Sequence, residues 1–279
     1  MGNAPKVDSK EVGLEIGLLL GKYFLKTEDL HYGFWPVGET ADISNFAQAQ
    51  ENHSAFILDN IPTNTKTILD VGAGAGNFAQ KLIDRGYQVD CVIPSKFLTE
   101  KLRTKLGDQS TVYPVTYEYM TTDKRYDLIL FSESFAYVNI KKAFEQTSKF
   151  LNPEGKLLIC DFFSLPSQEK SPIIGGHKFQ RFNEELSESP FKTVLDIDIT
   201  RETAPTYTIL TDFIELVAKP VTKISNRYLL SNYPRLMKFL TWKFRKRLNK
   251  LQRKYLTGKL TADSFEKFKT YRLFLFARK

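Results

Sequence analysis

Cysteine and histidine are scarce in this chain, and long apolar runs are missing. The 279 residues include two cysteines, Cys91 and Cys160, and three histidines. Both cysteines fall in expected central strands, so we expect them to be reduced core residues of a cytoplasmic protein. No apolar run approaches the roughly 18 residues of a transmembrane helix, and no group of His, Cys and acidic residues has metal-ligand spacing. The sequence therefore predicts neither a membrane span nor a metal site.

Acidic residues are absent from one long segment. Residues 216–262 carry thirteen Lys and Arg but no Asp or Glu, whereas the rest of the chain carries 27 basic and 32 acidic residues. Residues 234–256 are expected to form a helix with an apolar stripe and basic flanks. Three interpretations stay open: a helix packed on the sheet with its basic face in solvent, a helix lying on an anionic membrane surface, or a surface that binds RNA or an anionic acceptor.

What the chain does contain is a regular alternation of strand and helix patterns. Strands are expected at 67–71, 87–93, 111–116, 126–131 and 156–161, and helices at 77–85, 95–106 and 139–150. Two later strands are expected at 192–200 and 270–277. This alternation predicts an α/β fold with a doubly wound, mostly parallel sheet of seven strands.

The segments outside this alternation divide the chain. Helices are expected over 10–25 and over about 42–60, with Asp42 as the N-cap of the second. Four parts are therefore predicted: an N-terminal helical lid (1–60), the α/β core (61–204), a basic helical cap insertion (205–266) and the final strand (267–279).

The most informative motif follows the first expected strand. Asp70 lies near the end of this apolar run, and Gly72, Gly74 and Gly76 follow at every second position before a helical pattern begins at Asn77. A strand, a glycine turn and a helix in this order form a small-molecule cradle at the carboxyl end of a parallel strand. Glycines are needed there because a side chain would block close approach of a ligand to the backbone.

This Asp-x-Gly-x-Gly-x-Gly pattern resembles the first motif of class I S-adenosylmethionine (SAM)-dependent methyltransferases of the small-molecule type. The resemblance implies a Rossmann-like fold and a glycine turn that holds the methionine part of SAM. It also implies an acid at the end of the second strand that binds the ribose. Ile93 takes that place here, and Asp90 lies three residues too early. We therefore expect Ser95 and backbone groups near Ile93 to contact the adenosine.

The resemblance implies roles for further residues. Tyr32, in the aromatic loop His31–Pro36, would approach SAM, and Glu118 or its backbone would read the adenine. Ser132, just after the strand at 126–131, would lie against SAM.

Methyl transfer needs an acid or base only when the acceptor loses a proton. Candidates for this role are Glu133, placed near the point of transfer, and His31, His177 and Asp161. His177 follows two glycines in the insertion after the fifth strand, a region that lines the acceptor pocket in this family.

The predicted function is methyl transfer from SAM to a small, aromatic or lipophilic acceptor. The acceptor pocket is expected between the aromatic loop, the end of the fourth strand, the insertion around His177 and the late helices, which would close over it. Its aromatic side chains are expected to be Phe34, Trp35, Phe135, Tyr137, Phe162 and Phe163. Two alternatives stay open: an RNA methyltransferase that uses the basic helix, and a non-catalytic SAM-fold protein, because the ribose-binding acid is missing.

Overall fold

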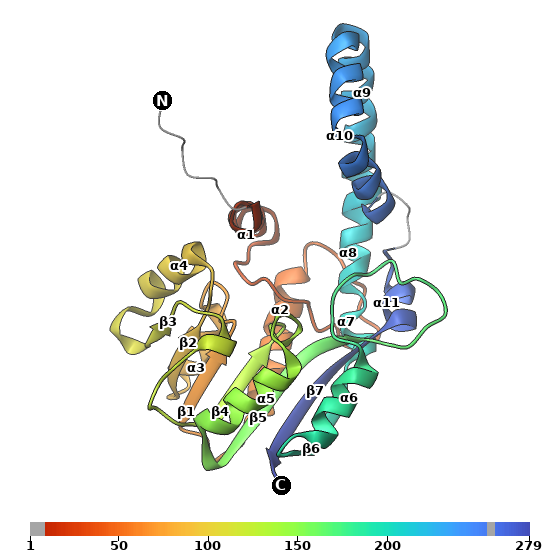
Figure 1. Ribbon diagram of the computed structural model, residues 1–279. Helices are drawn as coiled ribbons and strands as arrows, with labels where there is room; N and C mark the ends of the chain where they lie inside the picture. The colour runs from red at the N-terminus through yellow and green to blue at the C-terminus, as the bar shows by residue number, and fades with distance from the viewer. Residues whose placement is uncertain (1–8, 256–259) are drawn as a thin grey trace.

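The computed structural model describes residues 9–255 and 260–279. One seven-stranded sheet with the order β3-β2-β1-β4-β5-β7-β6 forms its centre (Figure 1). The strands are β1 Thr67–Val71, β2 Gln88–Val92, β3 Val112–Tyr113, β4 Tyr126–Ser132, β5 Leu151–Ser164, β6 Phe191–Asp198 and β7 Lys269–Arg278. β1 to β5 run parallel, and β7 lies antiparallel between β5 and β6. The predicted doubly wound fold is confirmed.

Helices cover both faces of this sheet. The helices are α1 Ser9–Leu20, α2 Phe46–Asp59, α3 Asn77–Asp84, α4 Lys96–Leu106, α5 Ile140–Phe150, α6 Phe179–Glu188, α7 Thr200–Thr203, α8 Thr206–Phe213, α9 Lys219–Asn232, α10 Pro234–Tyr255 and α11 Ala262–Phe268. Two π-helical segments, η1 Gly21–Leu25 and η5 Ile214–Ala218, extend α1 and α8.

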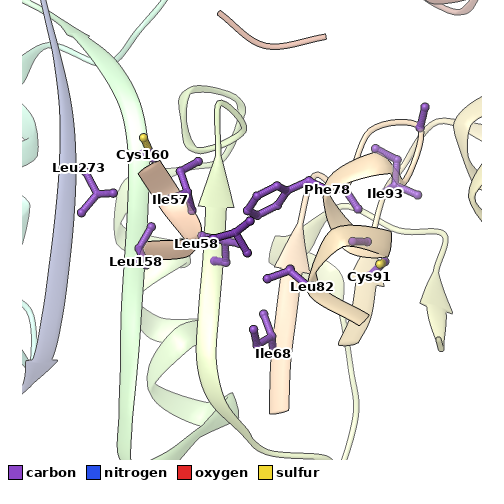
Figure 2. Packing of buried hydrophobic residues seen from close by; sticks show 14 of the residues in the cluster. Ile57, Leu58, Ile68, Phe78, Leu82, Cys91, Ile93, Leu158, Cys160 and Leu273 are labelled. Atoms are coloured by element: carbon purple, nitrogen blue, oxygen red, sulfur yellow. The ribbon is translucent and has the colours of Figure 1, made fainter. Parts of the chain in front are cut away.

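Alternate strand residues form two separate hydrophobic layers, because successive side chains of a strand point to opposite faces. On one face, Ile68 and Leu158 pack with Ile57 of α2 and with Leu82 of α3 (Figure 2). On the other, their strand neighbours pack against α5 and α6 through Phe144 and Phe182. Cys91 and Cys160 are buried, free thiols in the first layer, as expected.

The first predicted helix, over 10–25, is present as α1 and η1, whereas the second begins later than predicted. The first helix ends at Leu20 and continues as η1 to Leu25. The second begins at Phe46, with Asn45 as its N-cap residue. Asp42 instead accepts hydrogen bonds from the backbone N–H and the hydroxyl of Ser44, so its carboxylate closes a turn before the helix.

The late helices do not all close over the sheet. α8 and α11 lie against the body, whereas α9 and α10 extend away from it as a pair (Figure 1). This pair is called the basic hairpin below. Residue 256, at the end of the predicted helix 234–256, lies outside the described residues.

Candidate functional site

In the glycine turn between β1 and α3, one glycine allows close packing within the protein and another leaves open space beside the backbone. Gly72 has φ +85°, and a Cβ there would lie 2.3 Å from the Cβ of Ser134. The loop after β4 therefore packs directly on this backbone. Gly74 has φ +56°, and a Cβ there would meet no heavy atom within 4 Å. Gly74 is thus the open position, at which a ligand can approach the backbone.

Asp70, near the end of β1, is buried with an unpartnered oxygen. It is 2% exposed, and its Oδ2 has no hydrogen-bond partner. Burial raises the pKa of this carboxyl to about 7. A buried polar atom without a partner carries a free-energy cost. A ligand with a cationic group beside the turn would remove that cost, so Asp70 and Gly74 together fit the amino-acid end of SAM.

The end of β2 agrees with the register predicted from sequence. Ile93 directly follows the strand. Asp90 lies inside the strand, where its carboxylate accepts hydrogen bonds from Lys124 (2.8 Å) and from the Tyr126 hydroxyl (2.7 Å). These partners hold the pKa of Asp90 below its usual value against the effect of burial. Asp90 therefore forms an ion pair with Lys124 and has a structural role in this molecule.

A carboxylate does reach the end of β2, but it comes from α1. Glu11 Oε2 accepts hydrogen bonds from the Ser95 hydroxyl (2.9 Å) and from the backbone N–H of Phe97 (3.1 Å). Ser95 is also the N-cap of α4 and accepts from the N–H of Leu98. The sequence predicted Ser95 at this place and missed Glu11, because nothing local marks a glutamate that acts 84 residues away.

The chain just after α1 covers the first turn of α3. Asp29 accepts a hydrogen bond from Asn77 (2.8 Å) and lies 3.7 Å from the Lys81 ammonium. A cavity of about 690 Å³ opens here, and Glu28 and Lys105 are among its lining residues. The N-terminal segment thus places charged side chains beside the glycine turn.

Glu133 directly follows β4 in a strained conformation. Its φ is +53°, which is uncommon for a residue other than glycine. Its Oε1 accepts hydrogen bonds from the backbone N–H of Tyr32 (2.6 Å) and from the Tyr271 hydroxyl (2.8 Å). Burial, together with the nearby Asp161, raises the pKa of Glu133 to about 8, and these two donors moderate the rise.

Asp161 lies on β5 as a second buried carboxyl. It is 1% exposed and accepts hydrogen bonds from the backbone N–H groups of Ala136 (3.0 Å) and Phe162 (2.7 Å). Burial raises its pKa to about 7. Because both oxygens are held by backbone donors, Asp161 fixes the loop after β4 and adds negative charge near Glu133.

His53 extends this network behind Tyr271. Its Nε2 lies 2.9 Å from the Tyr271 hydroxyl. Since that hydroxyl donates to Glu133, it accepts from His53 Nε2–H, and Nδ1 remains without a partner. Burial lowers the pKa of His53 well below its usual value, so the ring is neutral. The sequence assigned no role to His53 and did not single out Tyr271.

Aromatic rings gather around Tyr32. The ring centroids of Phe162, Tyr207 and Phe265 lie 5.8, 5.9 and 5.7 Å from that of Tyr32. The Tyr32 hydroxyl is 3.1 Å from that of Tyr207 on α8.

Most of the predicted pocket aromatics lie elsewhere. Trp35, Phe135 and Phe163 are at most 1% exposed and belong to core clusters, because their neighbours form the hydrophobic layers. Phe34 stacks on Phe56 of α2. Tyr137 is 87% exposed. Of the six predicted aromatic side chains, Phe162 is the one whose ring lies beside Tyr32.

Two histidines predicted as catalytic have other partners. His177 Nε2 lies 3.1 and 2.9 Å from the carbonyl oxygens of Phe135 and Val138, so it fastens the loop after β4. His31 Nδ1 lies 2.8 Å from the carbonyl of Tyr32, and its ring stacks on His53 at 4.8 Å. Burial lowers the pKa of His31. His177 Nε2 is therefore engaged by two carbonyl oxygens, whereas His31 Nε2 is buried without a hydrogen-bond partner and lies 3.8 Å from Asp29 Oδ2.

The two remaining predicted cofactor residues have partners within the fold. Glu118 Oε1 accepts a hydrogen bond from the backbone N–H of Asn139 (3.0 Å), the N-cap residue of α5. Ser132 ends β4 beside Cys160 of β5.

The order of the sheet, the glycine turn after β1 and the buried acid before it define the class I SAM-dependent methyltransferases. The comparison of sequences agrees, because a family described as "Methyltransferase domain" matches residues 45–196. The chain belongs to this methyltransferase family, whose cofactor is SAM.

Individual relatives are more distant. The chain is 27% identical over 97 residues to an uncharacterized methyltransferase of Mycobacterium bovis, covering 35% of this chain and 40% of that protein. It is 29% identical over 126 residues to malonyl-[acyl-carrier protein] O-methyltransferase 1 of Ilyobacter polytropus, covering 42% and 47%. The chain thus spans less than half the length of these two relatives.

Solved structures match over nearly the whole chain. Geranyl diphosphate C-methyltransferase of Streptomyces coelicolor has a TM-score of 0.66 at 15% identity, covering 98% of this chain and 100% of that one. The cyclopropane synthase MmaA2 of Mycobacterium tuberculosis has a TM-score of 0.68 at 16% identity, covering 99% and 100%. At such low identity these likenesses establish the fold.

Proposed function

We propose that this protein transfers a methyl group from SAM to a small, aromatic or lipophilic acceptor, with Glu133 as the proton acceptor. The observation that carries this proposal is the strained, half-buried Glu133 at the end of β4, held by Tyr32 and Tyr271. Strained residues of this kind concentrate at active sites, where the surrounding structure holds them in place.

Gly74 and Asp70 contribute to SAM binding in different ways. Gly74 leaves the backbone open, and Asp70 offers a carboxyl oxygen without a partner. When bound, SAM supplies a methyl group on a positively charged sulfur, so the protein mainly has to position the two reactants.

Glu133 handles the proton. Its Oε1 is occupied by two donors, which fixes the plane of the carboxylate. In its ionised form, the carboxylate takes the proton that the acceptor atom loses as the bond to the methyl carbon forms. A general base with a pKa near neutrality combines ionisation with adequate basicity. The rings of Tyr32, Phe162 and Tyr207 provide the apolar surroundings for a flat or lipophilic acceptor.

A panel assay tests this function. The protein is incubated with SAM and with phenolic, prenyl and fatty-acyl acceptors and, as a separate arm, with RNA, and S-adenosylhomocysteine is quantified. We expect formation above background with at least one acceptor, and its loss in Glu133→Gln. Calorimetry with SAM runs in parallel: SAM binding without turnover on any acceptor, RNA included, would favour the non-catalytic alternative.

A further inference from the structure

We propose that the basic hairpin docks this protein on an anionic lipid bilayer. From residue 215 to residue 249, the part of the hairpin region whose side chains are described, no residue is buried. Two helices that bury no side chain gain little from packing on each other, and most helical stability in proteins comes from tertiary packing of an amphipathic face. The hairpin therefore needs a surface other than the described body of the protein to cover it.

Large apolar side chains are exposed to solvent along both α9 and α10. On α9, Val221, Ile224 and Tyr228 are each more than half exposed. On α10, Phe239 is 51% and Trp242 is 74% exposed. Exposed apolar surface of this extent marks an interaction site, and Trp and Tyr side chains favour the interface between bilayer and water.

Positive charge accompanies these apolar side chains. The segment 216–262 carries thirteen Lys and Arg and no acid. The Lys243 ammonium lies 5.5 Å from the ring centroid of Phe239 and 5.8 Å from that of Phe244, so cationic and aromatic groups share one surface. Apolar side chains with basic neighbours are typical of helices that lie in the interface of anionic membranes.

A second copy of this chain or an RNA would complement only part of the surface of the basic hairpin. A second copy of the hairpin would bring two sets of basic side chains together, which repel. RNA would neutralise the charge but would leave the aliphatic side chains of Val221 and Ile224 in water. An anionic bilayer accepts both, because headgroups pair with the cations and acyl chains take up the apolar groups.

The placement of the hairpin also suits a lipophilic acceptor. The hairpin and α1 both extend from the side of the sheet at which the parallel strands end (Figure 1). On α1, Ile16, Leu19 and Leu20 are each at least half exposed. Docking through the hairpin would therefore bring the edge that carries Glu133 toward the membrane.

Vesicle binding by the full-length protein tests the proposal. Co-sedimentation is measured with phosphatidylcholine vesicles with and without phosphatidylglycerol, at low and high salt. Trp242 fluorescence reports insertion directly, because the other tryptophan, Trp35, is 1% exposed. We expect binding to anionic vesicles only, weakened by salt, with a blue shift of the emission that is absent in Trp242→Phe.

Matched variants separate hairpin docking from general electrostatic attraction. Lys243→Glu/Lys246→Glu is expected to weaken binding about tenfold or more, and Phe239→Ser/Trp242→Ser to weaken it similarly. Lys141→Glu/Lys192→Glu, an equal charge change on exposed sites of α5 and β6, should have little effect. SAM calorimetry on each variant verifies folding independently of docking.

Three results would overturn the proposal. They are absence of binding to anionic vesicles at low salt, equal loss of binding in the hairpin and control variants, and displacement of the protein from vesicles by an RNA oligomer that binds the hairpin more tightly.

Discussion

The Tyr271 hydroxyl lies 2.8 Å from Glu133 Oε1 and donates a hydrogen bond to it. Tyr271 belongs to β7 and Glu133 to the loop after β4, so this bond joins two elements that are separated in the sheet by β5. The same hydroxyl accepts from His53 on α2. A single buried oxygen therefore orients the proposed base and connects it to a neutral histidine.

Replacing Glu133 by Gln tests the base itself. We expect turnover to fall by about 10²–10⁴-fold, the usual contribution of a general base, with SAM affinity nearly unchanged. In the wild type, turnover should rise with pH through about 8, because the ionised form of Glu133 is the active one. A pH–rate profile that stays flat across the pKa of Glu133, from about pH 6 to about pH 9, would contradict this role.

Removing the Tyr271 hydroxyl tests its influence on Glu133. The hydrogen bond from Tyr271 lowers the pKa of Glu133, so Tyr271→Phe should raise that pKa and move the rising limb of the pH–rate profile to higher pH. The free energy of unfolding should fall by about 1 kcal/mol, because His53 Nε2–H loses its oxygen acceptor and keeps only the weaker contact with Cys160 Sγ at 3.8 Å. Tyr207→Phe is the control, since the Tyr207 hydroxyl contacts Tyr32; it should leave the profile in place.

Two glycine variants separate ligand binding from packing. Gly74→Val should abolish SAM binding in calorimetry while costing about 1–2 kcal/mol of stability through its positive φ. Gly72→Ala should destabilise the fold more strongly, because its Cβ would collide with Ser134. Unchanged SAM affinity in folded Gly74→Val would show that SAM does not approach this backbone.

Glu11 tests whether α1 supplies the acid that β2 lacks. Glu11→Gln should weaken SAM binding by about 1.5–3 kcal/mol, the range for a hydrogen bond to a charged group. Glu15→Gln, four residues along α1 and exposed, is the matched control. If both variants bind SAM equally well, Glu11 caps α4 without contributing to the cofactor site.

Asp70 should cost stability at neutral pH. Its pKa is about 7 in the folded protein and about 3.9 when unfolded. The folded state therefore holds the proton more tightly, and the stability that this gives is complete below pH about 4 and is lost as the pH rises through about 7. Asp70→Asn should accordingly raise the free energy of unfolding of the SAM-free protein above pH 7 by at least about 1 kcal/mol while weakening SAM binding. Denaturant titrations at pH about 5 and 8 measure the difference.

Local features of the site could be predicted from the sequence because each lies within a few residues of its cause. The turn from Asp70 to Gly76 follows from a strand, three glycines and a helix in direct succession. Ile93, in place of the acid after β2, follows from the register of one strand.

The features that could not be predicted join distant residues. His53 contacts Tyr271 across 218 positions, and periodicity along α2 shows only that His53 faces inward. For the same reason Trp35, Phe135 and Phe163 were expected in the pocket although they lie in the core, because an aromatic run does not show which ring faces a ligand. The apolar stripe of α10 correctly predicted a helix, but not that this helix extends away from the sheet.

The position of β7 has a consequence for synthesis on the ribosome. β7 pairs with β5 from Lys269 to Ala277 and with β6 from Arg272 to Arg278, yet it is translated after the other six strands of the sheet. Until residues 269–278 emerge, the nascent chain exposes the edges of both neighbours, and the hydroxyl of Tyr271 is absent from Glu133. The sheet and the proposed base are therefore completed in the same late event, so a partly translated chain would have a cofactor turn but no oriented base.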